Sequence, residues 1–253
     1  MYYRDLYFNS VVAAGFILEA AIMVRILRTT LRRDLRVFLF YMVFSLTRTM
    51  LLTPIRTYYG FGSAAYFIAY WTTMAADTVL VFFVIQEVYA NVLHRYDGLR
   101  KLSGAMFRWT FVILILLALI TAYTAPANDT VRLTAMITVF DRGAMMVEAG
   151  LLVLLFVVAK ALSLSWRQCI FGIAFGLCLF SILDLAALTA RANLGDAFGF
   201  YYSLFKPAAY VATEFIWVVY LFRPERTRDR EFIPFGSDTL DHWNAAVLQY
   251  LNR

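Results

Sequence analysis

The feature that most constrains this chain of 253 residues is a series of apolar stretches, each long enough to cross a lipid bilayer. A helix rises about 1.5 Å per residue, so about 20 apolar residues span a hydrocarbon core of about 30 Å. Seven windows meet this requirement, at about 7–25, 37–58, 65–93, 107–125, 133–161, 169–190 and 199–222. The sequence therefore predicts an all-α, polytopic membrane bundle of seven transmembrane helices.

Composition supports lipid as the main partner of the chain. Hydrophobic residues make up 62% of the sequence, against about 45–50% in ordinary soluble domains. The net charge of +6 comes from clusters that lie between the apolar windows, which is typical of loops that face an anionic membrane surface. This distribution argues against nucleic acid as the partner of the basic residues.

Lysine and arginine are distributed unequally between the two sides of the predicted bundle. One side carries Arg25, Arg28, Arg32, Arg33, Arg36, Arg95, Arg100, Lys101, Arg108, Lys160, Arg167, Arg223, Arg226, Arg228 and Arg230. The opposite side has little beyond Arg4, Arg132 and Arg191. Because cytoplasmic loops carry the basic excess, we expect the N-terminus outside and the C-terminus inside. The first window contains Glu19 and precedes a basic run, so we expect a retained anchor and no cleaved signal peptide.

The sequence divides into a transmembrane bundle over 1–222 and a cytoplasmic tail over 223–253. In the tail, Pro234 and Gly236 break the chain, and apolar residues from Leu240 to Leu251 then recur at helical spacing. This pattern predicts a short amphipathic helix that lies on the membrane, packs on the bundle or docks a protein partner. The basic loops and the tail are therefore the expected partner contacts.

Ionisable residues inside the windows are the candidate functional residues, because a charge near the bilayer centre costs about 2.5–3.5 kcal/mol and tends to face the bundle interior. Together with one tyrosine, the candidate ligand site comprises Arg48, Arg56, Asp77, Asp141, Arg142, Glu148, Asp184, Lys206, Tyr210 and Glu214. Most of these residues fall in the outer half of the bundle, where acids and bases can neutralise each other. Glu19 and Glu87 fall towards the inner side.

Helical periodicity predicts that these residues face inward. One face of the seventh window carries, at helical spacing, Tyr202, Lys206, Tyr210, Thr213 and Trp217, with Glu214 beside it. One face of the second window carries Tyr41, Ser45, Arg48, Leu52 and Arg56. Stripes of this kind are typical of helices that line a polar interior.

Three interpretations of this polar layer remain open. The ion pairs can fix helix register, they can line a ligand or ion cavity open to the outside, or they can belong to a path across the bundle. Arg48 and Lys206 are the expected direct contacts of a small anionic ligand, since unpaired cations bind carboxylates.

Several sharper hypotheses fail on spacing. Lys206 is the one lysine available for a retinal Schiff base but lies near the outer end of its window, so a retinal protein is a minor alternative. Neither His94 nor His242 lies within a window, which argues against haem between helices, and we expect no cofactor and no metal. Gly172 and Gly176 form a GxxxG motif and predict close helix packing.

The two cysteines, Cys169 and Cys178, lie nine residues apart in the sixth window. In a helix this spacing puts them on different faces and too far apart to bridge, so we expect free thiols.

Three short motifs carry a resemblance to a known group of proteins. They are Phe107-Arg108-Trp109, Ser165-Trp166-Arg167 with the run from Phe171 to Gly176, and Ile216-Trp217 through Tyr220. With these motifs the chain resembles a family of seven-helix membrane proteins from acidobacteria-like soil bacteria. The resemblance implies a bacterial cell membrane and seven helices, and it carries over no functional residues.

The sequence thus favours a non-enzymatic sensor, receptor-like protein or accessory subunit of a membrane complex. The alternative is an ion-coupled or small-solute transporter, although no internal repeat is evident between the two halves of the chain.

Overall fold

The computed structural model describes residues 2–60, 63–94, 97–124, 129–161, 169–194 and 196–223. Within these ranges the chain is helical apart from short connections, and no strand occurs there. The elements are α1 (Tyr2–Leu27), η1 (Thr30–Arg32), α2 (Arg36–Tyr59), α3 (Ala64–Val92), α4 (Asp97–Thr124), α5 (Asp129–Ala161), α6 (Cys169–Leu194) and α7 (Asp196–Leu221). The predicted all-α bundle is therefore confirmed.

Seven of the helices are long and apolar enough to cross a membrane. Their spans are Ser10–Leu27, Arg36–Tyr59, Ala64–Val92, Gly98–Thr121, Met136–Lys160, Cys169–Ala187 and Leu204–Leu221. The chain is thus a multi-pass membrane protein. The predicted amphipathic helix of the tail lies outside the described residues.

The largest difference from the predicted boundaries is at α4, which begins at Asp97, ten residues before the expected start of the window at 107. The many polar residues of this stretch predict a loop. Leu99 and Met106 pack against the core and Ser103 is buried, so one face of the stretch is covered by the bundle. Asp97 also lies in the first turn, where a negative charge stabilises a helix. The stretch is therefore an amphipathic extension of α4.

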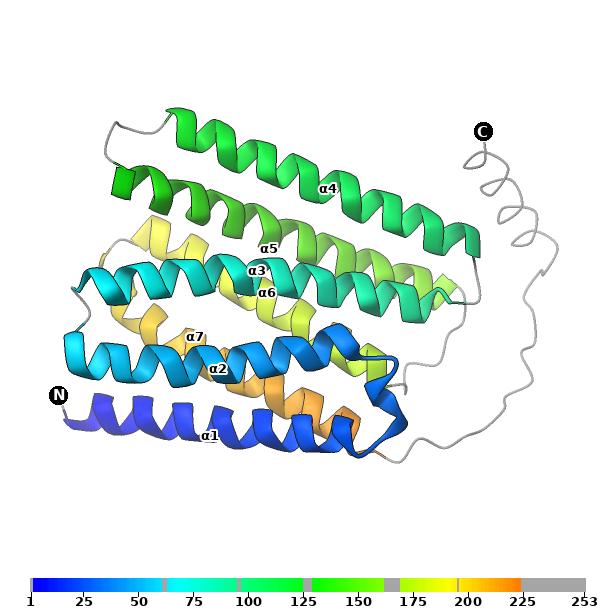
Figure 1. Ribbon diagram of the computed structural model, residues 1–253, viewed down its shortest axis with the longest axis horizontal. Coiled ribbons are helices and arrows are strands. Elements are labelled where there is room, and N and C mark those ends of the chain that lie inside the picture. The colour runs from blue at the N-terminus through cyan, green and yellow to red at the C-terminus, as the bar shows by residue number, and fades with distance from the viewer. Residues whose placement is uncertain are drawn as a thin grey trace.

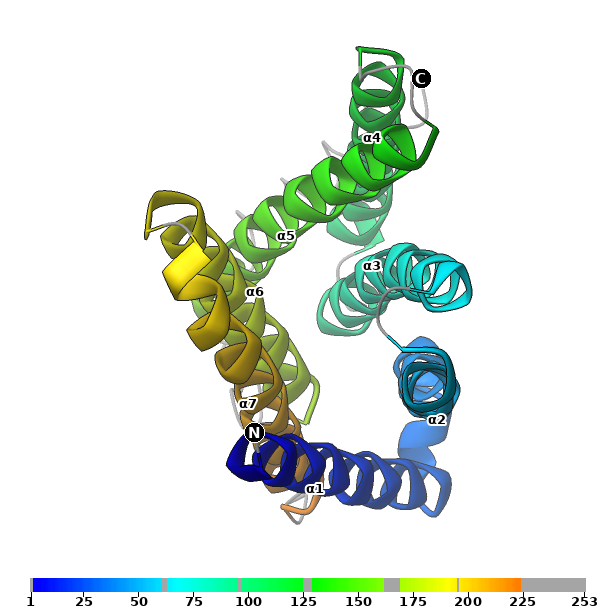
Figure 2. The ribbon, with the colours of Figure 1, turned by 90° about the vertical axis from the view of Figure 1, so that its left-hand side faces the viewer.

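The helices run up and down along one long axis (Figure 1). Seen from the end where the N-terminus lies, the bundle is a ring in the order α1, α2, α3, α5, α6 and α7, and α4 lies outside this ring (Figure 2). Each neighbouring pair in the ring is in contact, α1 with α7 included, and α4 packs on α3 and α5. Helix α3 also contacts α6. This closed order lets five or six helices contribute side chains to one interior.

The two ends of the bundle differ in charge. At one end, which we call the basic end, lie Arg28, Arg32, Arg33, Arg36, Arg100, Lys101 and Arg223. The other end, which we call the N-terminal end, holds the start of α1 (Figure 1). If the basic end is cytoplasmic, as the sequence predicts, the N-terminal end faces outside.

The apolar core is concentrated in the half of the bundle next to the basic end. The largest fully buried side chains are Trp217, Phe38, Phe107, Ile22, Ile26, Leu35, Met42, Ile85, Leu152, Leu155, Ile173 and Leu221. Trp217 packs edge-on against Phe38, with ring centroids 5.1 Å apart, and its Nε1 donates to the Ile173 carbonyl over 3.2 Å. We call the group of Trp217, Phe38 and Leu35 the apolar plug.

The predicted close packing at the GxxxG motif is confirmed. A Cβ atom at Gly172 would overlap the ring of Tyr220, and one at Gly176 would overlap the indole of Trp217. The two glycines therefore let aromatic side chains of α7 lie directly on the backbone of α6. This close approach positions Trp217 of the apolar plug against α6.

The start of α2 is stabilised by a residue from another helix. Leu35 precedes α2 and offers no side-chain cap. The Glu87 carboxylate of α3 instead accepts hydrogen bonds from the backbone N–H groups of Val37, over 2.8 Å, and Phe38, over 2.9 Å. Since the first N–H groups of a helix have no partner within it, Glu87 acts as a cap. Its place near the basic end agrees with the sequence analysis.

Candidate functional site

A layer of charged side chains lies between the apolar core and the N-terminal end. It contains Arg48 of α2, Asp77 and Thr78 of α3, Asp141 of α5, Asp184 of α6 and Lys206 of α7, and we call it the polar layer. Five helices contribute to it, namely α2, α3, α5, α6 and α7.

The first ion pair of the polar layer joins α2 to α3. Arg48 Nη1 lies 3.3 Å from Asp77 Oδ2, and both side chains are partly exposed. The hydroxyl groups of Tyr41 and Tyr70 are close enough to Arg48 to interact with its charge. The guanidinium thus links α2 to α3 through Asp77.

The second ion pair joins α6 to α7. Lys206 Nζ donates to Asp184 Oδ2 over 2.7 Å. The Asp184 side chain is 1% exposed and that of Lys206 is 37% exposed. The carboxylate is therefore buried and depends on its polar neighbours, whereas the long lysine side chain reaches the surface.

Asp141 is the third aspartate of the layer. Its Oδ1 accepts a hydrogen bond from the Thr78 hydroxyl over 2.7 Å, and it is buried. Among the described ion pairs none involves Asp141, although the charges of Lys206, Asp184 and Asp77 act on it. The layer therefore holds three aspartates around two cations.

Glu148 lies two turns further along α5, towards the basic end. It is buried, and its Oε1 has no hydrogen-bond partner among the described residues. The Ser181 hydroxyl of α6 interacts with its carboxyl group. Glu148 extends the surplus of acidic groups from the polar layer into the middle of the bundle.

A second polar group lies between α1, α2 and α7, closer to the basic end. The Glu19 Oε1 atom accepts hydrogen bonds from the hydroxyls of Ser45, over 2.5 Å, and Tyr210, over 3.0 Å. The Glu19 and Glu214 carboxyl groups interact with each other. We call Glu19 and Glu214 the carboxyl pair.

The carboxyl pair and the polar layer are connected through tyrosines. Tyr210 lies one turn from both Lys206 and Glu214 on α7, and its hydroxyl also contacts Ser45 over 2.9 Å. The hydroxyls of Tyr41 and Tyr210 interact with each other, and the charge of Arg48 acts on both. Polar groups thus continue from the polar layer to Glu214, where the apolar plug begins one turn further on.

Most candidate residues from the sequence analysis face this interior, but two of them do not join it. Arg142 is exposed, because it follows Asp141 directly and a helix turns about 100° per residue. Arg56 is half-buried and interacts with Tyr66 near the N-terminal end of α3.

The expectation that Arg48 and Lys206 are unpaired cations is wrong. Each has an aspartate partner, on α3 and α6 respectively. An anionic ligand would therefore compete with carboxylates that already hold these side chains.

Three residues outside the candidate set contribute to the site, namely Glu19, Ser45 and Thr78. The sequence places Glu19 towards the inner side of the membrane, apart from the candidate site. In the structure Glu19 of α1 instead accepts a hydrogen bond from Tyr210 of α7. The signal that could have found it is its position among apolar residues of the first window. Nothing in the sequence identifies Thr78 as a site residue apart from its position next to Asp77.

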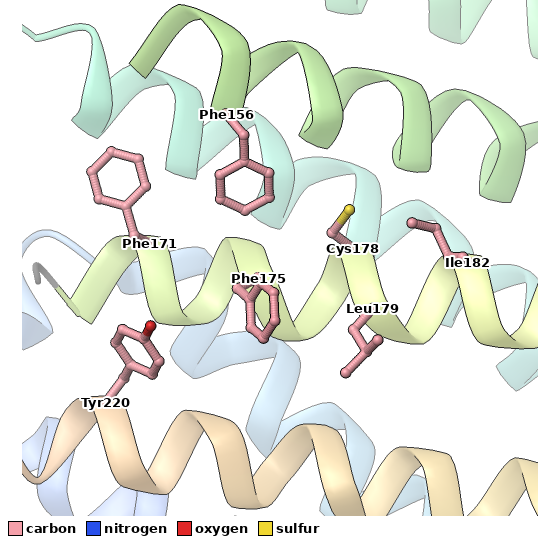
Figure 3. Close-up of a pocket in the computed structure, with 7 residues that line it drawn as sticks. All are labelled: Phe156, Phe171, Phe175, Cys178, Leu179, Ile182 and Tyr220. Carbon is pink, nitrogen blue, oxygen red and sulfur yellow. The ribbon is translucent and has the colours of Figure 1, made fainter. Parts of the chain in front are cut away.

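A partly open apolar pocket of about 300 Å³ has no residue of either polar group in its described lining. It is lined by Phe156, Phe171, Phe175, Cys178, Leu179, Ile182 and Tyr220, and the side chains converge from α5, α6 and α7 (Figure 3). None of these seven lining residues is charged. Cys169 and Cys178 are both buried and do not form a disulfide with each other, as expected.

Comparison with known proteins finds no family model, no curated protein and no solved structure that matches this chain. Among the described residues no group of three or more His, Cys, Asp or Glu side chains could hold a metal ion. The chemistry of the site therefore has to be inferred from its own residues.

Proposed function

We propose that this protein is a non-enzymatic, receptor-like membrane protein or complex subunit that binds a small cationic solute in the polar layer. The observation that carries the proposal is the excess of acids: among the described residues of the layer, three aspartates, Asp77, Asp141 and Asp184, lie with two cations, Arg48 and Lys206. Asp141 has a hydroxyl donor but no ion pair among the described residues. A bound ammonium group would supply the missing positive charge next to a buried carboxylate.

The distribution of packing supports access from the N-terminal end. The fully buried apolar side chains gather in the half next to the basic end. In the polar layer, by contrast, Arg48, Asp77 and Lys206 are partly exposed. A solute would thus enter from the predicted outside and stop above the apolar plug. In this proposal the basic loops and the tail contact a cytoplasmic partner, and the protein resides in a bacterial inner membrane.

Ligand binding tests the proposal directly. The purified full chain in lipid nanodiscs is heated with ethanolamine or with glycolate, two solutes of similar size and opposite charge. We expect ethanolamine, and not glycolate, to raise the unfolding temperature. Asp141→Asn should remove this shift, and Arg142→Gln, which changes the exposed neighbour, should retain it. A shift with glycolate alone, or with neither solute, would contradict the proposal.

A transporter is the second candidate, because polar groups continue from the polar layer to Glu214. Eight residues of α7 separate Lys206 from Glu214, which corresponds to about 12 Å of the membrane. The apolar plug then interrupts the path. In proteoliposomes a receptor-like protein should produce no uptake of ethanolamine and no proton flux, whereas a transporter should produce one of them.

A further inference from the structure

We propose that Glu19 and Glu214 share one proton and form a proton-binding site at the contact of α1 and α7. This site uses no carboxylate of the polar layer, so it is independent of the solute proposed above. Its carrying observation is Glu214 itself, which is 0% exposed and has no hydrogen-bond partner for either carboxyl oxygen among the described residues.

The position of Glu214 depends on a glycine of α1. A Cβ atom at Gly15 would lie 3.3 Å from Glu214 Oε2. Since position 15 has no side chain, the Glu214 carboxyl can lie directly against the α1 backbone. The residue one turn further on the same helix is Glu19, which is 4% exposed. The two helices thus hold two carboxyl groups together away from solvent.

Charge balance requires a proton at this position. Neither residue takes part in an ion pair of the described chain. Two ionised carboxylates in an apolar interior repel each other strongly, and an unpaired buried charge is costly. Two carboxylates also have no hydrogen to donate to each other, whereas a carboxylate and a carboxylic acid form a strong hydrogen bond. One shared proton removes both problems, as it does in other carboxyl pairs.

The hydrogen bonds indicate which member carries the negative charge. Ser45 and Tyr210 both direct hydroxyl groups to Glu19 Oε1. Hydroxyl donors stabilise an ionised oxygen, so Glu19 is the carboxylate and Glu214 is the acid. Glu214 has no such donor among the described residues. This is expected of a neutral carboxylic acid that donates its own proton to Glu19.

Among the described residues, no ion pair brings a cation to the carboxyl pair. The titratable or charged groups that face it are Tyr210 on α7, Tyr41 and Arg48 on α2, and Asp77 on α3. Arg48 is engaged by Asp77. On α6, Asp184 is engaged by Lys206, two turns of α7 from Glu214. Loss of the shared proton would therefore leave two adjacent negative charges between α1 and α7.

Infrared spectroscopy of the full chain in lipid nanodiscs tests the proposal. At neutral pH we expect a carbonyl band of a protonated carboxylic acid in the wild-type spectrum. One component of this band should disappear in Glu214→Gln and should also be lost or shifted in Glu19→Gln. Glu87→Gln is the matched control, because Glu87 is held as a carboxylate by two backbone N–H groups, and it should leave the band unchanged.

In the described part of the chain Glu148 is the second buried acid with an unpartnered oxygen, so Glu148→Gln assigns a second component of the band. A wild-type spectrum without a protonated acid at neutral pH would overturn the proposal, and this result needs no variant to fold. A band that responds only to Glu148→Gln would overturn it as well.

Thermal unfolding as a function of pH gives a second readout. As the pH rises the shared proton leaves, the two charges repel and the unfolding temperature of the wild type should fall. In Glu214→Gln the amide donates to Glu19 at every pH, so this fall should be smaller. Identical pH profiles for the two proteins would contradict the shared proton, whatever the outcome with ethanolamine.

Discussion

Lys206 Nζ donates to Asp184 Oδ2 over 2.7 Å, yet the two side chains differ sharply in exposure, at 37% and 1%. The pair therefore joins a buried anion of α6 to a cation of α7 that reaches the surface. Such an unequal pair should respond differently to the loss of either partner.

The first prediction concerns the unequal exposure of Lys206 and Asp184. Lys206→Met deprives a buried carboxylate of its cation, and breaking a buried pair in this way costs about 3–5 kcal/mol. Asp184→Asn leaves an ammonium that can reach water with its long side chain, so we expect a loss of about 1 kcal/mol. Unfolding in detergent measures both free energies. Equal losses would show that both members are buried to the same degree in the membrane.

The second prediction concerns the contact of α6 with α7. Gly172→Ala introduces a methyl group where the Tyr220 ring lies, and overpacking of this kind costs about 1–3 kcal/mol. Gly150→Ala is the matched control, because a Cβ atom there meets nothing within 4 Å. We expect only Gly172→Ala to lower the unfolding temperature. Tyr220→Ala in the same chain should restore part of the loss, and no restoration would argue against the clash.

The third prediction concerns the cap of α2. Glu87→Ala leaves the N–H groups of Val37 and Phe38 without their acceptor, and loss of a cap costs about 1–2 kcal/mol. Glu87→Gln keeps one acceptor oxygen and should lose about half as much. Hydrogen exchange at the Val37 and Phe38 amides should accelerate in Glu87→Ala. Unchanged exchange at these amides would contradict the assignment of Glu87 as the cap.

The fourth prediction concerns orientation. Thr30→Cys places a thiol at the exposed η1 turn of the basic end, and Tyr58→Cys replaces a side chain that is 84% exposed at the other end. A membrane-impermeant maleimide should label Tyr58→Cys in intact cells and Thr30→Cys only after permeabilisation. The native cysteines are buried and should react slowly. Labelling in the reverse order would place the basic end outside.

The helices themselves were predictable because a bilayer imposes length and hydropathy on each of them separately. The residues from 36 to 59 or from 169 to 187 carry enough apolar surface to identify a span without knowledge of their neighbours. The predicted start of α4 was wrong because the first turns of this helix are polar on one face. The burial of their other face depends on contacts with other helices.

The sequence could predict which residues belong to the candidate site but not which acid pairs with which base. Charge inside a membrane helix is costly, so Arg48, Asp77 and Lys206 were identifiable as interior groups. Their partners depend on helix neighbours and rotation. Helical geometry already separates Asp141 from Arg142, but only the bundle shows which of the two faces inward. Glu19 was missed as a site residue because its neighbours there come from α2 and α7.

The sequence by itself determined the medium, the number of spans and the positions of the charged groups, since all three follow from local hydropathy and helical rise. Only the tertiary structure decided that the buried apolar side chains gather in one half of the bundle and that Glu214 of α7 lies against Gly15 of α1, one turn from Glu19. The physical reason is that charge pairing and burial depend on atoms from helices far apart in the chain. Their distances are set by packing and not by the spacing of residues within any single helix.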